Sequence, residues 1–203
     1  ETAFYSATGA FDAAARIVEL TSGMPFNEYI DQYIMKPLGI SDITFVPSEE
    51  QWGRMSQMHY FDGQKVWYED TGRTTFEGFP LTYYCGGAGL AGTADAYSEF
   101  AEMLLNEGGL RGTAVLEPES VRRMKTPYVP ISGDRNDAQW WGLGVRVIAN
   151  DRYTLPKGCF GWSGAYGSHF WVDPENRITA VYMKNSRYDG GAGAQSSAWF
   201  EED

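Results

Sequence analysis

Three glycines, Gly161, Gly164 and Gly167, interrupt a strand-like run near the C-terminus, and this segment limits the possible folds more than any other. It is followed by aromatic residues, an Asp-Pro-Glu-Asn turn at 173–176 and the apolar run 178–183. The pattern predicts a glycine-lined strand, a hairpin and a buried partner strand. A bare strand edge lets a substrate carbonyl lie against backbone N–H groups, which is what acyl transfer requires. The alternative is that the glycines merely relieve a bulged strand.

Helical periodicity dominates the first part of the chain. Apolar residues recur at helical spacing over Ala10–Leu20, which Gly23 ends, and again from Pro25 to Gly39, with Pro25 at the first helical position. These two segments predict an α-helical hairpin. A further helix is expected after Thr93, which can cap it, and a short one over Pro118–Met124.

From Trp141 onward the apolar period becomes two, with Leu143, Val145 and Val147 on one side of a strand. Further strands are expected at 160–163, 168–172 and 178–183, and the last ten residues can begin a helix. We therefore predict an α+β fold in which an antiparallel sheet is flanked by helices and joined to a helical subdomain. The division is residues 1–125, mainly helical, and residues 139–203, the sheet and the C-terminal segment.

Residues 41–85 form an aromatic, turn-rich excursion within the helical part. Asp62-Gly63 predicts a hairpin between 59–61 and 65–68. A long irregular segment of this kind is often a loop that covers a substrate. A surface insertion without a function explains it equally well.

The composition excludes several classes of partner. The net charge of −11 makes nucleic acid and anionic membranes poor partners. Cys85 and Cys159 are too few for a disulfide scaffold, and we expect both to be buried. The residues 86–90, Gly-Gly-Ala-Gly-Leu, lack the cation of a phosphate loop.

The histidines do not suggest a metal site. His59 and His169 lack the spacing of metal ligands, and we expect His169 on a strand facing solvent or a cleft. We therefore expect neither a metal nor another cofactor. No apolar run reaches transmembrane length. The chain opens on Glu1 without a methionine, which suggests an internal part of a longer protein.

Four motifs follow one another along nearly the whole chain: Tyr5-Ser6-Ala7 before a helix, the segment 25–42, the glycine loop 86–90, and Trp162-Ser163-Gly164. In this order they resemble the serine β-lactamase and penicillin-binding-protein-like family, and within it the class C-like esterases and acyltransferases. The last motif stands at the position of the family's Lys-Thr-Gly or His-x-Gly strand.

This resemblance implies a serine hydrolase that acts on esters or amides through an acyl-enzyme. It assigns Tyr5 as the proton shuttle and the backbone N–H of Ala165 as an oxyanion donor. Trp162, Ser163 and Gly164 would bind the substrate. Because a tryptophan replaces the family's cation, neutral esters are favoured over anionic lactams, unless Lys157 or Arg146 restores the charge.

Two departures from the family pattern matter. No serine of this chain is followed three residues later by lysine, although the family's nucleophile lies in a Ser-x-x-Lys motif. We therefore expect residues 1–203 to be the C-terminal portion of one catalytic domain, N-terminally incomplete and inactive alone. Ala7 replaces the family's asparagine, so lactam recognition is in doubt. Loss of the N-terminal part would expose apolar surface and favour self-association.

Two alternatives stay open. Gly161–Ala165 nearly matches the Gly-x-Ser-x-Gly elbow of α/β-hydrolases, which would make Ser163 a nucleophile, but that elbow needs a strand followed by a helix. The other is a non-catalytic binding or sensor domain on the same scaffold, using the aromatic excursion. The sequence leaves the compartment undecided between bacterial cytoplasm and cell envelope.

Overall fold

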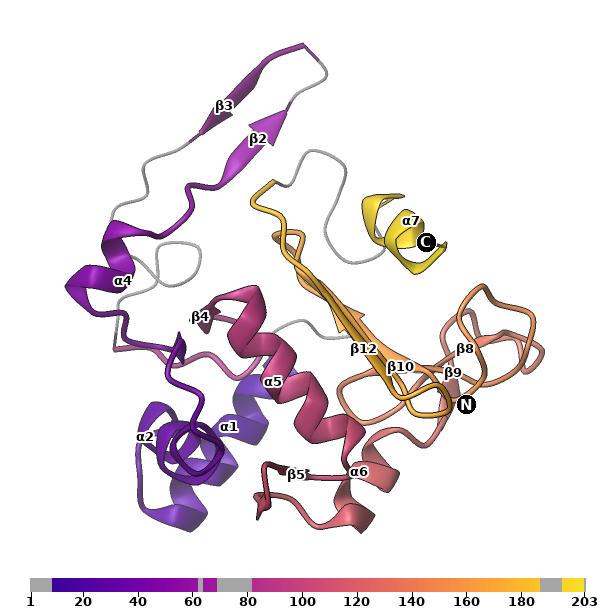
Figure 1. Ribbon diagram of the computed structural model, residues 1–203, viewed down its shortest axis with the longest axis horizontal. Coiled ribbons are helices and arrows are strands. Elements are labelled where there is room, and N and C mark those ends of the chain that lie inside the picture. The colour runs from indigo at the N-terminus through magenta and orange to yellow at the C-terminus, as the bar shows by residue number, and fades with distance from the viewer. Residues whose placement is uncertain (1–8, 62–63, 69–81, 187–194, 203) are drawn as a thin grey trace. The chain divides into compact units, whose positions relative to one another are not determined.

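The computed structural model describes residues 9–61, 64–68, 82–186 and 195–202. These residues form two compact units that interleave along the chain. One unit contains residues 9–56 and 82–97, and the other contains 57–61, 64–68, 98–186 and 195–202. Figure 1 shows the elements of both.

The first unit begins with the predicted pair of helices. α1 (Gly9–Ser22) is followed by Gly23, whose φ of 72° is the left-handed conformation that ends a helix. The second helix comprises α2 (Phe26–Ile30), a π-helical turn η1 (Asp31–Met35) and α3 (Lys36–Leu38), and Gly39 ends it with the same φ. Pro25 is the N-cap residue of this helix, not its first helical residue as predicted.

The rest of this unit contains a short two-stranded ladder, in which β1 (Ile43–Thr44) pairs with β4 (Ala91–Gly92), and α4 (Glu49–Gly53) follows β1. Asp12 of α1 accepts hydrogen bonds from the Tyr83 hydroxyl (2.6 Å) and the Gly86 amide (2.8 Å). A Cβ at Gly86 would lie 2.1 Å from the Phe11 carbonyl oxygen. The glycine loop therefore serves a close backbone approach to α1.

Two hairpins and two helices come before the sheet of the second unit, and the first of these helices begins within the first unit. α5 (Ala94–Leu105) begins where the Thr93 hydroxyl accepts from the Ala96 amide at 3.2 Å, which confirms the predicted cap. α6 (Pro118–Met124) also has its predicted bounds. β5 (Gly109–Leu110) pairs with β6 (Thr113–Ala114), and the predicted hairpin is confirmed as β2 (His59–Phe61) against β3 (Val66–Tyr68).

The central feature of the second unit is a six-stranded antiparallel sheet in the order β12-β11-β10-β9-β8-β7. Its strands are β7 (Val129–Pro130), β8 (Gln139–Trp141), β9 (Arg146–Ile148), β10 (Phe160–Ser163), β11 (His169–Asp173) and β12 (Ile178–Tyr182). The predicted meander is confirmed. The prediction that Leu143 belongs to a strand is wrong, because it lies exposed in the turn between β8 and β9, where Gly144 has a φ of 78°.

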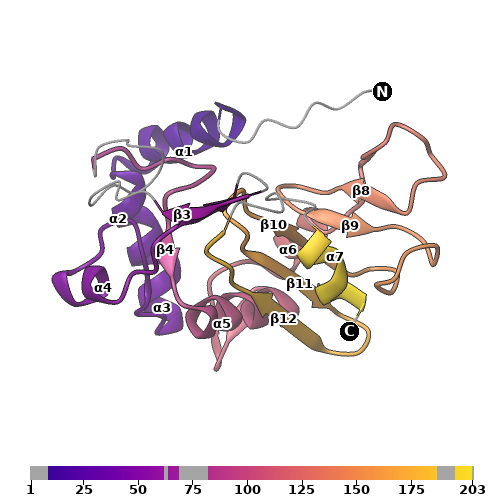
Figure 2. The same ribbon diagram turned by 90° about the horizontal axis from the view of Figure 1, so that it is seen from above.

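Helices cover both faces of this sheet, as the α+β prediction required. α7 (Gln195–Glu202) lies over one face, where the Phe200 ring stacks on Tyr182 of β12 (Figure 2). On the other face, the ammonium of Lys125, just after α6, lies 5.8 Å from the centre of the Phe160 ring. Phe160 and Val172 share this face because they are directly paired, and Phe170 shares it because it lies two residues before Val172 on β11. All three side chains are buried.

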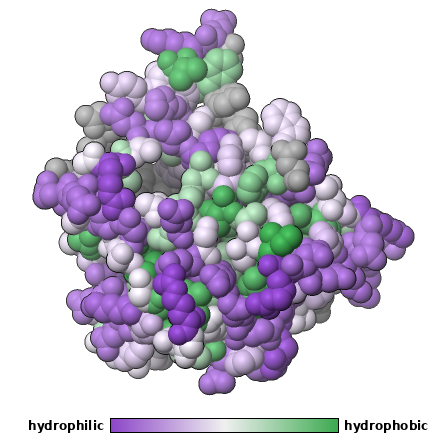
Figure 3. Space-filling view, viewed as in Figure 1, coloured by the Kyte–Doolittle hydropathy of each residue, from purple (hydrophilic) through white to green (hydrophobic). Residues whose placement is uncertain are grey.

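Both cysteines are buried free thiols, as predicted. Among the described residues, no group of histidine, cysteine and acidic side chains could hold a metal ion. The described helices include none that is long and apolar enough to span a bilayer. The face seen in Figure 3 is mostly hydrophilic, with smaller apolar patches. Ile17, Leu20 and Trp199 are examples of exposed apolar side chains. Self-association stays a prediction.

Candidate functional site

The hairpin between β10 and β11 carries all the predicted site residues that the structure describes. Its last strand pair is Ser163 with His169. Beyond it, the Gly164 amide donates to the Ser168 carbonyl (2.7 Å) and the Gly167 amide to the Gly164 carbonyl (3.1 Å). Gly167 has a φ of 97°. This is a three-residue hairpin loop with a left-handed glycine at its end.

Two of the three glycines have backbone reasons for being glycine. A Cβ at Gly161 would lie 2.0 Å from the Phe170 carbonyl oxygen, so the strands could not stay at this distance. Gly167 adopts the left-handed turn conformation. At Gly164, a Cβ would meet only the Ser168 hydroxyl at 2.4 Å, which can rotate away. Gly164 is therefore the position where a functional demand for a bare backbone is easiest to test.

The turn contains a backbone donor, the Ala165 amide, on an exposed residue. Ala165 is exposed, and its amide makes no hydrogen bond within the described part of the chain. β10 runs past the end of β9, since the pairing between them covers only Phe160 and Gly161. Beyond that point the Trp162 ring contacts Trp141 edge-on, with 4.7 Å between ring centres. A turn N–H that makes no hydrogen bond within the described residues can bind and polarise a carbonyl oxygen.

Behind the turn, a row of polar side chains is buried between the sheet and α7. The Ser163 hydroxyl lies 2.7 Å from His169 Nδ1, and His169 Nε2 lies 2.9 Å from Glu201 Oε1. The second contact is an ion-pair distance without the angle of a linear hydrogen bond. Ser163, His169 and Glu201 are 7%, 2% and 6% exposed.

Besides His169, two other side chains hold Glu201. Arg146 of β9 forms an ion pair with Oε1, and the Tyr153 hydroxyl donates to Oε2 at 2.7 Å. Burial raises the pKa of this carboxyl, but His169, Arg146 and Tyr153 together outweigh burial and lower the pKa to about 2. Glu201 is therefore an anion at neutral pH, held in place from three sides.

The predicted residues are placed as follows. Trp162, Ser163, Gly164 and Ala165 share one strand end and its turn, whereas Tyr5 lies outside the described residues. The functions assigned to them stay predictions. The hydroxyl of Ser163 points to His169 rather than to solvent, and Arg146 is engaged by Glu201.

The prediction that His169 faces solvent or a cleft is wrong, because α7 covers it. Sequence reasoning also missed Glu201 and Tyr153. A weak signal was present: once the turn is placed at 164–168, His169 must stand opposite Ser163 on the same face. The position of Glu201 had no signal, because it depends on where α7 packs.

The nucleophile-elbow alternative is contradicted. That motif needs a helix directly after the strand, and β10 is followed by a hairpin turn and β11. The buried position of Ser163 argues against it as well.

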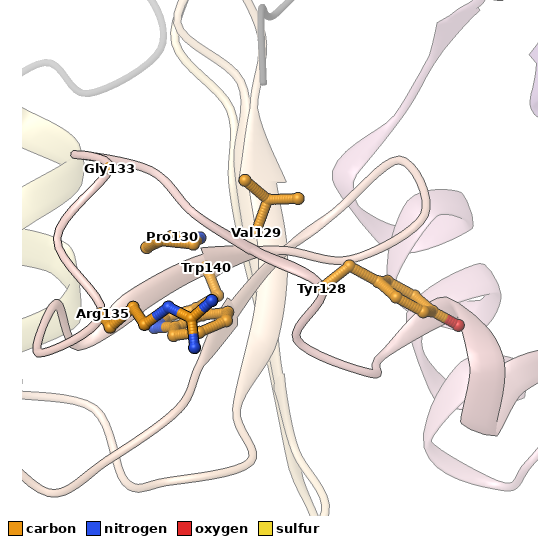
Figure 4. Close-up of a pocket in the computed structure, with 6 residues that line it drawn as sticks. All are labelled: Tyr128, Val129, Pro130, Gly133, Arg135 and Trp140. Carbon is orange, nitrogen blue, oxygen red and sulfur yellow. The ribbon is translucent and has the colours of Figure 1, made fainter. Parts of the chain in front are cut away.

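A hollow of about 220 Å³ lies elsewhere in the same unit, beside β7 and β8. In Figure 4 the side chains of Arg135 and Trp140 lie on one side of β7, while Tyr128 extends away from them. The residues that line this hollow are Tyr128, Val129, Pro130, Gly133, Arg135 and Trp140. None of the predicted site residues lines it, and we assign it no role.

Comparison with known proteins agrees with this fold. The family model described as Beta-lactamase matches residues 1–199. Protein Rv1367c of Mycobacterium tuberculosis is 30% identical over 86% of this chain and 47% of its own length. Esterase EstB of Burkholderia gladioli is 26% identical over 91% of this chain and 50% of its own. The chain spans about half the length of the curated relatives it matches.

Solved structures have the same architecture at low sequence identity. EstCE1, described as a hydrolase with promiscuous acyltransferase activity, superposes with a TM-score of 0.75 and 22% identity, over 95% of this chain and 52% of its own. An octameric penicillin-binding protein homologue from Pyrococcus abyssi gives a TM-score of 0.70 and 21% identity, over 92% of this chain and 39% of its own. These likenesses concern the fold alone.

Proposed function

Because the chain belongs to the beta-lactamase family, we propose that it supplies the carbonyl-binding part of a serine hydrolase that acts on esters or amides through an acyl-enzyme. The observation that carries the proposal is the amide of the exposed residue Ala165, just after β10, which has no hydrogen bond within the described residues. In this proposal the amide binds the oxyanion of the tetrahedral intermediate. The esterase among the relatives supports the reaction class.

The remaining parts of the mechanism are divided between this chain and the rest of the protein. The nucleophilic serine would come from outside residues 1–203, because no Ser-x-x-Lys motif is present here. Tyr5 would move the proton between this serine and the leaving group. Trp162 would pack on the acyl group and exclude water. Its lack of charge favours neutral esters over anionic substrates.

The oxyanion role of a backbone N–H can be tested by proline. Ala165 is the second residue of the turn that the Gly167 amide closes, a position that favours proline in common turns. Ala165 is not among the described residues with a positive φ, so Ala165→Pro removes the N–H at a position whose φ has the sign that proline requires. In the full-length protein we expect kcat for an activated ester to fall about 100-fold or more, with little change in KM.

The matched control is Ala165→Ser, which keeps the N–H and changes only an exposed side chain. We expect its kcat to stay within a few-fold of that of the unchanged protein. Equal activity of the proline and serine variants would refute the oxyanion role. A full-length protein that shows no stoichiometric burst with an activated ester would refute the acyl-enzyme itself, and would favour a binding or sensor domain on this scaffold.

A further inference from the structure

The last pair of residues before the hairpin turn is joined by side chains as well as by the strand ladder. Ser163 and His169 are directly opposite each other, and the hydroxyl–Nδ1 distance is 2.7 Å. Only residues 164–168 lie between them, and these include the Ala165 amide. A side-chain bond at this rung therefore closes a small ring of covalent and hydrogen bonds that contains the whole turn.

The imidazole that makes this bond is held from its other side by α7. His169 Nε2 lies 2.9 Å from Glu201 Oε1, and the Phe200 ring packs edge-on against the imidazole at 6.1 Å. Glu201 is itself fixed by Arg146 and Tyr153. The turn is thus linked to α7 through one imidazole ring, which contacts Ser163 on one side and Glu201 on the other.

Burial explains why this link has a positioning role rather than a nucleophilic one. Ser163 is 7% exposed and His169 is 2% exposed, so a substrate carbonyl cannot approach the hydroxyl without displacing α7. Buried polar groups are costly when a partner is lost, and networks of them define one arrangement of the chain around them.

We propose that His169 and Glu201 are positioning residues, which act through Ser163 to hold the Ala165 amide where the oxyanion forms. This inference rests on the proposed function. None of the three side chains touches the reacting atoms. Their contribution is to keep the turn in one conformation, so that the amide is already oriented when charge develops on the carbonyl oxygen.

The two halves of the link can be broken separately with matched substitutions in the full-length protein. Ser163→Ala removes the hydroxyl. His169→Gln keeps an amide near Nε2, toward Glu201, and loses the group near Nδ1. His169→Asn keeps a polar group near Nδ1, toward Ser163. Glu202→Gln is the control, because it changes an exposed side chain of α7 that takes no part in the link.

We expect Ser163→Ala and His169→Gln to lower kcat for an activated ester about tenfold, normalised to the burst amplitude, with KM changed less than twofold. His169→Asn, which keeps the contact with Ser163 but not the contact with Glu201, is expected to lower kcat less than His169→Gln does, and Glu202→Gln is expected to leave kcat unchanged. A loss of fold alone would lower the burst amplitude and leave the normalised kcat unchanged, so the two effects are separable.

Hydrogen exchange of the peptide that contains residues 164–168 provides a readout independent of activity. We expect exchange at least tenfold faster in Ser163→Ala and His169→Gln, and unchanged in Glu202→Gln. Unchanged exchange in all variants would overturn the inference, and so would faster exchange with a normal kcat. Faster exchange in a protein that gives no burst would leave the turn-holding link supported and refute the proposed function.

Discussion

Glu201 should make the free energy of unfolding depend on pH in the acid range, and the substitution Glu201→Gln should remove this dependence. Its carboxyl has an ordinary pKa of 4.5, lowered to about 2 in the folded protein. The folded state therefore binds this proton less readily than the unfolded state. The stabilisation is fully present above about pH 4.5 and is lost as the pH falls through the folded value of about 2.

The magnitude follows from the shift. A difference of about 2.5 pKa units at 1.36 kcal/mol each corresponds to about 3 kcal/mol of folding free energy. Solvent screening reduces this little, because the side chain of Glu201 is 2% exposed and that of Arg146 is 10% exposed. Removing the carboxylate also leaves the Arg146 charge buried without its partner, which adds destabilisation at every pH.

The assay is urea unfolding of the full-length protein and of Glu201→Gln between pH 7 and pH 2. The stability difference between the two proteins should shrink by about 3 kcal/mol over this range, mostly below pH 4.5. Other carboxyls with lowered pKa values, such as Asp12 and Glu107, titrate in both proteins and cancel in the difference.

The control is Glu202→Gln, which removes the same charge from the neighbouring, exposed position of α7. Its stability should follow that of the unchanged protein in parallel over the whole pH range. If the curve of Glu201→Gln also ran parallel, Glu201 would not be the buried, paired anion described above.

Three further expectations concern individual side chains. Gly161→Ala should destabilise the protein by about 3 kcal/mol or more in urea unfolding, and Gly164→Ala by less than about 1.5 kcal/mol. The reason is that only the new methyl group at position 161 meets backbone atoms, which cannot move away. Equal losses of stability would contradict the strand spacing. The hydrogen bond to Asp12 and, to a lesser extent, burial raise the pKa of Tyr83 to about 12. Asp12→Asn should therefore move this pKa toward 10 in an ultraviolet titration, and Tyr83→Phe identifies the signal of this tyrosine. Burial, and then Asp173, raises the pKa of Cys159 to about 12, so alkylation followed by mass spectrometry should show no labelling before unfolding; rapid modification of the native protein would contradict the burial.

The sequence was a good guide to the local structure. α6 and the hairpin at 59–68 follow from patterns within a few residues, because propensity, capping and turn conformation act over that range. The same is true of Gly23 and Gly39, whose left-handed conformation ends each helix. Leu143 shows the limit: an alternating apolar pattern continued through a turn, and Gly144 decided the backbone there.

The residues of the candidate site also fall into those that the sequence could indicate and those that it could not. Trp162, Gly164 and Ala165 could be selected from the sequence because they are neighbours in one motif, and a strand followed by a turn places neighbours together. His169 was assigned to the wrong environment, since an alternating pattern separates two faces of a sheet without indicating which face a later helix covers. Glu201 reaches His169 only because the chain folds α7 back over β9–β12.

Residues 160–183 alone indicate two strands joined through a glycine-containing segment, and the resemblance to the family is what singles out the Ala165 N–H. Which polar groups lie beneath that segment was decided by long-range packing, because electrostatic and hydrogen-bonding partners are selected by distance in space and not by separation along the chain.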